Sequence, residues 1–510
     1  MTINGEHGIV EAKNVRKNMI SSILLQAVTM ICSFIIPQVT LRCFGSAVNG
    51  LCNSITQFLN VIALLEGGAT SVVLANLYAP VRQNNIEKIN RIVAASNIFF
   101  RQLATIFVIY AAIVGFIYPL IKEMPFDYEY VVALVWVIGF STFIQYAYAF
   151  TYRILLRAGQ RVYIVSYIQI IFNILNTIVM VILATTSRNV LFARVGSAIV
   201  FLIQPLLLSH FANKYFPIDK KAKPDETALS QRWDSFGQNI AYFIHSNTDI
   251  VLLTIFSSFL EISVYTVHSG IIAAVRGIIL SVSTAFGPTM GYILAGKNEE
   301  ETKQTFSVYT FLVWFIAIIM FSTTIITIEP FISVYTMGIE DVNYRRFLFA
   351  AFLICAEAIY CIRDPYISVI YSKGHFKQTK WSAYGEAIIN IVLSMVLIKR
   401  FGIEGVAMGT LIGMVVRGIY SAHYVHNNLI SDTIKQFYSF FFSLVAFFGL
   451  SITVGYHIQS ITIGGYLRWV RMAGCVFVVN TVCISAISYL LYRKALIQML
   501  KLIFKRSNSV

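Results

Sequence analysis

The chain has 510 residues, of which 57% are hydrophobic and only 12% are charged. Soluble domains carry about 25% charged residues, and a mean hydropathy of +0.72 would give a soluble fold large exposed apolar patches. The composition therefore predicts a polytopic membrane protein. The composition excludes a soluble enzyme. It also excludes nucleic-acid binding despite a net charge of +15, because we expect no soluble module that could form a nucleic-acid site.

The apolar segments predict an all-α fold with about 14 transmembrane helices. The first segment follows Lys17 and continues to about Leu41, longer than the apolar part of a signal peptide, so we expect a first transmembrane helix. The predicted segments are 19–41, 50–78, 92–119, 130–156, 162–185, 190–212, 235–256, 264–294, 305–328, 346–371, 381–398, 403–425, 437–456 and 470–492.

Basic residues predict the orientation of these helices. With the N-terminus in the cytoplasm, most of the 39 Lys and Arg residues fall in cytoplasmic loops and tails. This bias is the positive-inside rule, so we expect both termini in the cytoplasm. The net charge is then a topology signal and not a nucleic-acid footprint.

The segments divide into two lobes and an appendix. A charged loop with two prolines follows the sixth segment, and a basic, amphipathic tail follows the last, which we expect to form an interfacial helix. The predicted divisions are an N-terminal lobe at 1–213, a linker at 214–234, a C-terminal lobe at 235–428, two further helices at 429–492 and the tail at 493–510.

A weak internal repeat relates the two lobes. Residues 152–183 match residues 366–397 at an offset that spans six helices, which would give lobes of equal orientation. The matched pairs are Tyr152 with Tyr366, Asn176 with Asn390 and, with a one-residue gap, Gly159 with Gly374.

The seven cysteines predict no chemistry. None forms a CxxC pair and most lie in apolar runs, where cysteine is a small buried hydrophobe. We expect neither a metal site nor a disulfide framework.

Arg276 is the most informative residue, because it is the only formal charge between Val264 and Leu294. A guanidinium at mid-membrane costs roughly 3 kcal/mol on insertion scales. It must therefore face a partner or a hydrated cavity, and we expect an anionic ligand.

Polar stripes occur on the predicted helices 1, 2, 7 and 8, and on helix 7 steps of three and four residues put the polar side chains on one face. They predict a hydrated cavity between the lobes; the alternative is that they hydrogen-bond the helices together. The stripes include Gln26 on helix 1, Asn53 and Glu66 on helix 2, His245 and Asp249 on helix 7, and Ser269, Arg276 and Ser283 on helix 8.

Several of these residues have two open interpretations. Asp249 lies at a depth where it would pair with Arg276, either as a structural salt bridge or as a group that competes with a phosphate for the guanidinium. His245 is either a proton carrier or structural. Glu66 is either a proton- or sodium-coupling carboxylate or a neutral buried acid.

The predicted helices 10 to 12 contain further charges. Glu357 lies deep in helix 10, whereas Arg363 is close enough to a basic loop to snorkel. Glu386 is expected at the membrane interface, and Arg417 lies within helix 12.

We find no catalytic motif: GxxxxGK[ST], HExxH and GxSxG are all missing. The outer loops are short, and the longest is expected around 329–344. We therefore expect a protein that is not an enzyme and has no cofactor apart from coupling to H⁺ or Na⁺.

The opening of the chain carries a family resemblance. It contains KNMISSILLQ from Lys17, the loop FGSAVNGL from Phe44, LLEGGATSVVLANLY from Leu64 and the basic loop VRQNNIEKINRI from Val81. These segments resemble Wzx-like polysaccharide flippases of the multidrug/oligosaccharidyl-lipid/polysaccharide (MOP) exporter superfamily.

The resemblance implies two pseudo-symmetric six-helix lobes in a V shape, plus two C-terminal helices. It implies transport of undecaprenyl-diphosphate-linked oligosaccharides across the bacterial cytoplasmic membrane by alternating access, with cation antiport. It also implies membrane lipid, a polysaccharide polymerase and assembly proteins as partners. Glu66, Asp249 and Arg276 match the family's cavity positions best, followed by Glu357 and Arg417.

The sequence differs from the family in one respect, and three alternative functions stay open. The predicted helix 1 has no charge between Asn18 and Leu41, which disfavours a flippase of peptidoglycan precursors. The rivals are a multidrug cation antiporter of the same superfamily, with an acidic cavity; a membrane enzyme of glycan assembly, with large outer loops; and a scaffold or scramblase.

Overall fold

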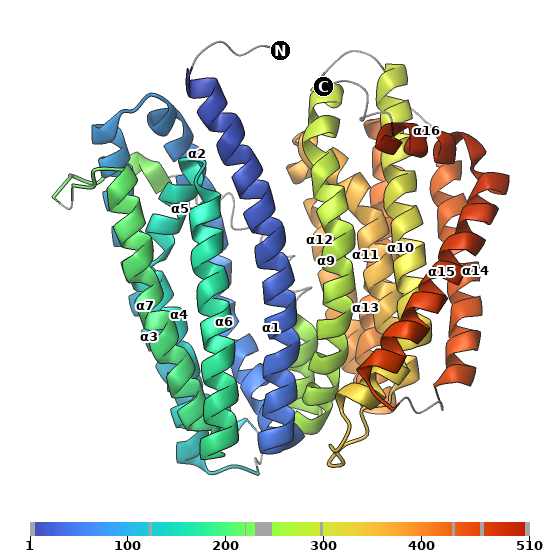
Figure 1. Ribbon diagram of the computed structural model, residues 1–510, viewed down its shortest axis with the longest axis horizontal. Helices are drawn as coiled ribbons and strands as arrows, with labels where there is room; N and C mark the ends of the chain where they lie inside the picture. Colours follow the sequence, from blue (N-terminus) through green and yellow to red (C-terminus); the bar gives the residue numbers. More distant parts are fainter. Residues whose placement is uncertain are drawn as a thin grey trace. The chain divides into compact units, whose positions relative to one another are not determined.

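The structure, a computed structural model, describes residues 6–121, 125–219, 221–229, 247–295, 299–430, 434–459 and 464–504. Within these ranges every regular element is a helix, as the sequence predicts (Figure 1). The chain forms two compact units, Met1–Ser263 and Val264–Val510.

The first unit contains the helices up to Tyr215, a short 3-10 helix after them, a helix at 247–256, and the first residues of α9. Its elements are α1 (Glu6–Leu59), η1 (Asn60–Ile62), α2 (Ala63–Arg82), α3 (Ile86–Ile117), η2 (Tyr118–Leu120), α4 (Tyr128–Tyr148), α5 (Phe150–Ala158), α6 (Val162–Ser187), α7 (Val190–Tyr215) and η3 (Glu226–Leu229).

The second unit contains the remaining helices. They are the rest of α9 (Phe259–Ala295), then α10 (Glu299–Tyr335), α11 (Phe347–Ser372), α12 (Phe376–Phe401), α13 (Ile403–Asn428), α14 (Lys435–Ile458), α15 (Tyr466–Leu491) and α16 (Arg493–Phe504). The predicted amphipathic tail forms α16.

Eleven helices of the described ranges are long and apolar enough to cross a membrane. One of these, Ile20–Ile62, runs through the predicted first loop, where only Gly45 leaves helical geometry, with φ 81° and ψ 172°. The 26-residue α11 is not among the eleven, because Glu357, Arg363 and Asp364 interrupt its apolar sequence.

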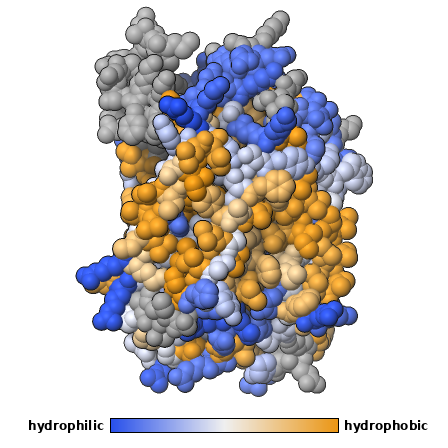
Figure 2. Space-filling view, turned by 90° about the vertical axis from the view of Figure 1, so that its right-hand side faces the viewer, coloured by the Kyte–Doolittle hydropathy of each residue, from blue (hydrophilic) through white to orange (hydrophobic). Residues whose placement is uncertain are grey.

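Apolar side chains form a broad band across the face shown in Figure 2, with polar side chains concentrated above and below it. Many large hydrophobic residues of the long helices are exposed, for example Leu490 at 77% and Leu206 at 66%. Such exposure is costly in water and expected in lipid, so the chain is a multi-pass membrane protein.

The first unit extends to Ser263. Residues 247–263 belong to the first unit because they pack against α1. The side-chain amide of Asn49 donates to Ser263 Oγ at 2.8 Å, and the hydroxyls of Ser54 and Thr254 are 2.6 Å apart. Gly50 lets the backbone at Phe259 approach α1 directly.

The backbone supports the internal repeat. Both bounds of α12 lie 214 residues after those of α6, and both helices have 26 residues. The left-handed residues before and after these helices recur at the same offset: Gln160 (φ 55°) with Gly374 (φ 71°), and Arg188 (φ 49°) with Gly402 (φ 58°). Gln160 and not Gly159 is therefore the counterpart of Gly374, and the alignment needs no gap.

We predict that Gly50→Ala strongly destabilises the protein. A Cβ at this position would lie 1.8 Å from the carbonyl oxygen of Phe259, a backbone atom with no rotamer to relieve the clash. Overpacking of a well-packed core costs about 1–3 kcal/mol, and we expect the upper end. The measurement is the thermal unfolding temperature of the purified protein in detergent.

Gly449→Ala in α14 is the matched control, since a Cβ there meets nothing within 4 Å. Its higher helix propensity should leave stability unchanged or raised by up to about 1 kcal/mol. Equal unfolding temperatures for the two variants would contradict the close approach at Gly50.

Candidate functional site

Arg276 forms an ion pair within the second unit. Its Nη1 on α9 donates to Glu357 Oε1 on α11 at 2.8 Å. The two side chains are 26% and 14% exposed, so the pair is accessible from one side. Glu357 Oε2 is buried and has no hydrogen-bond partner among the described residues, which leaves capacity for one more interaction.

A second charged group lies one to two turns further along α11. Arg363 Nη1 donates to Glu386 Oε1 at 3.1 Å, and Arg417 Nη1 donates to the other oxygen of the same carboxylate. Arg363 and Glu386 are 4% exposed and Arg417 is 11% exposed. We call these three residues the buried triad.

Tyr360 lies between the ion pair and the buried triad. The guanidinium carbon of Arg276 is 5.6 Å from the centre of its ring, and that of Arg363 is 5.0 Å from it. Both distances are within the range of cation–π attraction. The ring thus links the partly exposed arginine to the buried one.

Glycines on α13 explain how Glu386 reaches Arg417. Gly405, Gly409 and Gly413 recur every four residues and precede Arg417 on the same face. A Cβ at Gly409 would lie 2.7 Å from the backbone nitrogen of Ser394 on α12. Small residues at this spacing allow close helix approach, and the buried hydrogen bond from Asn390 to Thr410 at 2.9 Å fixes the register.

Asp364 adds a third acid beside the triad. Its Oδ2 accepts a 2.5 Å hydrogen bond from Ser283 on α9, and the hydroxyls of Ser283 and Tyr309 are 2.6 Å apart. The arginines Arg276, Arg363 and Arg417 are thus matched by Glu357, Glu386 and Asp364. The cluster is compact and close to electrically neutral when no ligand is bound.

The remaining predicted residues belong to the first unit. Asp249 is buried, at 4% exposure, and its pairing with Arg276 stays a prediction. Glu66 is half-buried and accepts a 2.8 Å hydrogen bond from Thr70. Asn53 donates to the backbone oxygen of Asn49 at 2.9 Å. Gln26 is exposed on α1, and His245 lies outside the described residues.

One prediction about an individual charge was wrong, and a second residue is more buried than its sequence suggested. Glu386 is 4% exposed, because two arginines converge on it. Arg363 is buried and does not snorkel, because Glu386 provides a nearer partner than the membrane surface. The stripe of glycines that ends at Arg417 is the sequence signal that would have indicated this contact.

A further buried pair escaped the sequence analysis. Glu329, predicted at the start of an outer loop, lies within α10 and is 1% exposed. Its Oε1 is 3.9 Å from His268 Nε2, and its Oε2 is 3.9 Å from Arg345 Nε. His268 Nδ1 is 2.9 Å from the carbonyl oxygen of Val264. The sequence analysis placed the end of a helix at Glu329 and Pro330, because an apolar sequence ends there, and so it did not predict that Glu329 is buried.

We predict that Glu386→Gln destabilises the protein more than Glu357→Gln. Removing one partner of a buried ion pair costs about 3–5 kcal/mol, because the other charge stays buried and uncompensated. Glu386 neutralises two arginines, whereas the partly exposed Glu357 pair is screened by water and should cost less. Thermal unfolding in detergent compares the two variants, and an equal or larger effect of Glu357→Gln would contradict this ranking.

Comparisons with known proteins agree on the fold. No family model and no curated protein matches the sequence. The structure of the lipid II flippase MurJ in an inward closed conformation is similar with a TM-score of 0.68 at 15% identity, covering 92% of this chain and 98% of that chain.

Two multidrug transporter structures are also similar. An inward-facing MATE family transporter of the MOP superfamily has a TM-score of 0.60 at 15% identity, covering 83% of this chain and 95% of its own. The MATE transporter DinF-BH has a TM-score of 0.59 at 16% identity, covering 82% and 96%. The chain therefore shares the fold of these three structures.

Proposed function

We propose that this protein is a flippase. It would translocate undecaprenyl-diphosphate-linked oligosaccharide repeat units from the inner to the outer leaflet, by alternating access, for the synthesis of a surface polysaccharide such as O-antigen, capsule or exopolysaccharide. It would reside in the bacterial cytoplasmic membrane with both termini in the cytoplasm. The observation that carries the proposal is the partly exposed ion pair of Arg276 and Glu357.

Arg276 is the arginine of this cluster best placed to bind a ligand. Its side chain is 26% exposed, compared with 4% for Arg363 and 11% for Arg417. A guanidinium presents a planar set of N–H donors that matches phosphate oxygens in a bidentate way. The diphosphate of a lipid-linked sugar fits this chemistry, while the prenyl tail stays in lipid.

Glu357 would act as the exchangeable counter-ion of Arg276. In the absence of ligand its Oε1 accepts from the guanidinium at 2.8 Å, so a diphosphate would compete with it. Transport requires a site that binds the substrate in one state and releases it in another. Competition between a carboxylate and a diphosphate for one arginine would make substrate affinity differ between the two states. A small movement of α9 relative to α11 would decide which of the two anions pairs with Arg276.

The main alternative is a multidrug cation antiporter, since MATE transporters share the fold. A site for a cationic drug needs an acid whose charge is available. Glu357 and Glu386 are instead paired with arginines, so the charge of these two carboxylates is not available to a cationic drug. We retain H⁺ or Na⁺ as the coupling ion, with Glu66, Asp249 and His245 as its candidate ligands. A polysaccharide polymerase and assembly proteins remain the proposed partners.

Arg276→Ala should abolish export of the surface polysaccharide while the protein level is retained, because the diphosphate loses its charged partner. Lipid-linked repeat units should accumulate in the inner leaflet. Arg400→Ala, which removes an exposed charge at the end of α12, should leave export unchanged. Normal polysaccharide at the surface of Arg276→Ala cells would disprove the assigned role.

Asp249→Asn should change the pH dependence of transport, because it removes a buried titratable group from the proposed coupling path. The measurement is the initial transport rate in proteoliposomes over a range of pH. A profile that coincides with that of the unaltered protein would remove Asp249 from the coupling mechanism.

A further inference from the structure

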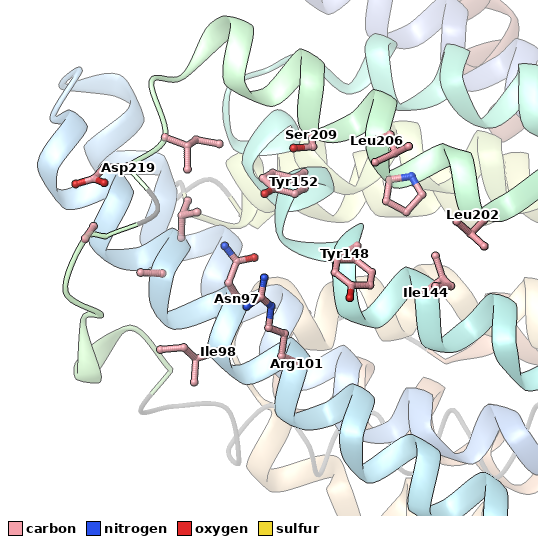
Figure 3. A pocket seen from close by; sticks show the side chains of 15 residues that line it. Asn97, Ile98, Arg101, Ile144, Tyr148, Tyr152, Leu202, Leu206, Ser209 and Asp219 are labelled. Atoms are coloured by element: carbon pink, nitrogen blue, oxygen red, sulfur yellow. The ribbon is translucent and has the colours of Figure 1, made fainter.

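A cavity of about 640 Å³ opens in the first unit between α3, α4, α5, α7 and the segment that follows α7 (Figure 3). It is separate from the charged cluster of the second unit. Its walls combine apolar residues with polar ones. The polar residues are Asn97, Arg101, Tyr148, Tyr152, Ser209 and Asp219.

Arg101 is at an unfavourable position unless something binds it. The uncharged part of α3 begins at Ile92, so with a rise of ~1.5 Å per residue Arg101 lies about 14 Å along it. The side chain is exposed, and its guanidinium makes no hydrogen bond or ion pair to the described part of the protein. A lipid-facing guanidinium at this depth costs roughly 3 kcal/mol on insertion scales.

The cavity is built around this charge. Figure 3 shows the side chains of Asn97 and Arg101, one turn apart on α3, next to each other and on the same side of the cavity as Tyr148. These groups supply a guanidinium, an amide and phenol hydroxyls, all of which donate hydrogen bonds. Asp219, the carboxylate in the lining, lies at the far end on the segment after α7.

That segment forms a fixed end wall. The side-chain amide of Asn90 donates to the carbonyl oxygen of Pro217 at 3.1 Å, and its oxygen accepts from the backbone N–H of Asp219 at 3.1 Å. The backbone N–H of Asp225 donates to the carbonyl oxygen of Arg91 at 3.1 Å. The end of the cavity nearest the basic loops is thus anchored to α3.

The apolar wall faces lipid. Ile98 is 47% exposed, Leu202 41% and Leu206 66%. An occupant with an anionic head and an apolar chain would satisfy both kinds of wall at once, since the head would neutralise Arg101 and the chain would cover these residues.

We propose that this cavity binds an anionic phospholipid of the leaflet on the side of the basic loops, with its phosphate on Arg101. That leaflet is the predicted cytoplasmic one. Side chains on an α-helix tilt toward its N-terminus, which for α3 is the end with the basic loop, so the guanidinium reaches toward the head-group region. The bound lipid is a resident of the fold and not the transported substrate.

The test is the thermal unfolding temperature of the purified full-length protein in a neutral detergent, titrated with phosphatidylglycerol or with phosphatidylcholine. Phosphatidylglycerol should raise the unfolding temperature in a saturable way and phosphatidylcholine should not. Arg101→Gln should weaken the phosphatidylglycerol response about tenfold or more, because it removes a charge-assisted hydrogen bond.

Lys88→Gln is the matched control, since it removes one exposed positive charge from the same helix outside the cavity. It should keep the full response. Tyr148→Phe keeps the charge and loses one hydroxyl, and it should weaken the response less than Arg101→Gln does. This second variant tests the cavity even if Arg101→Gln is poorly folded.

Three outcomes would overturn the proposal. The first is an unchanged phosphatidylglycerol response in Arg101→Gln and Tyr148→Phe. The second is protection by inorganic phosphate at the same concentrations, which would show that no lipid chain is needed. The third is Arg101-dependent protection by undecaprenyl diphosphate but not by phosphatidylglycerol, which would make the cavity a substrate site. None of these results depends on whether Arg276 binds a transported substrate.

Discussion

Ionisable groups within a membrane need a partner, and α11 carries three of them in a short stretch. Glu357, Arg363 and Asp364 lie within two turns of each other. Glu357 pairs with Arg276 on α9, Asp364 with Ser283 on α9, and Arg363 with Glu386 on α12. Because unpaired charges are costly in this environment, these contacts fix how α9 and α12 pack against α11. The same contacts that hold the second unit together create the arginine cluster that we propose binds an anion.

The packing of small residues decides which charges can meet. The glycines of α13 bring α12 close enough for one carboxylate to bind both Arg363 and Arg417. Arg276, the more exposed arginine, pairs with Glu357, and the second oxygen of that carboxylate has no hydrogen-bond partner in the described part of the chain. The structure thus separates the buried triad from the more exposed pair of Arg276 and Glu357.

Much of the fold could be predicted from the sequence, because hydropathy over a helix length is a strong local signal. The all-helical fold and the tail helix α16 followed from it, whereas the continuation of α1 through the predicted loop to Leu59 did not. Pairings between helices could not be predicted, because they depend on contacts between distant residues. Arg276 was recognised from its isolation, but Glu357 as its partner, the burial of Glu386 and the pair of His268 with Glu329 required the three-dimensional packing. The repeat was visible as a weak match, and the left-handed residues at its corners strengthened it.

Binding of undecaprenyl diphosphate to purified protein tests the central claim most directly. If Glu357 competes with the diphosphate for Arg276, Glu357→Gln should bind it about tenfold or more tightly than the unaltered protein, because the resident counter-ion is gone. Arg276→Gln should bind it far more weakly. Equal or weaker binding by a folded Glu357→Gln protein would contradict the exchange of partners at Arg276.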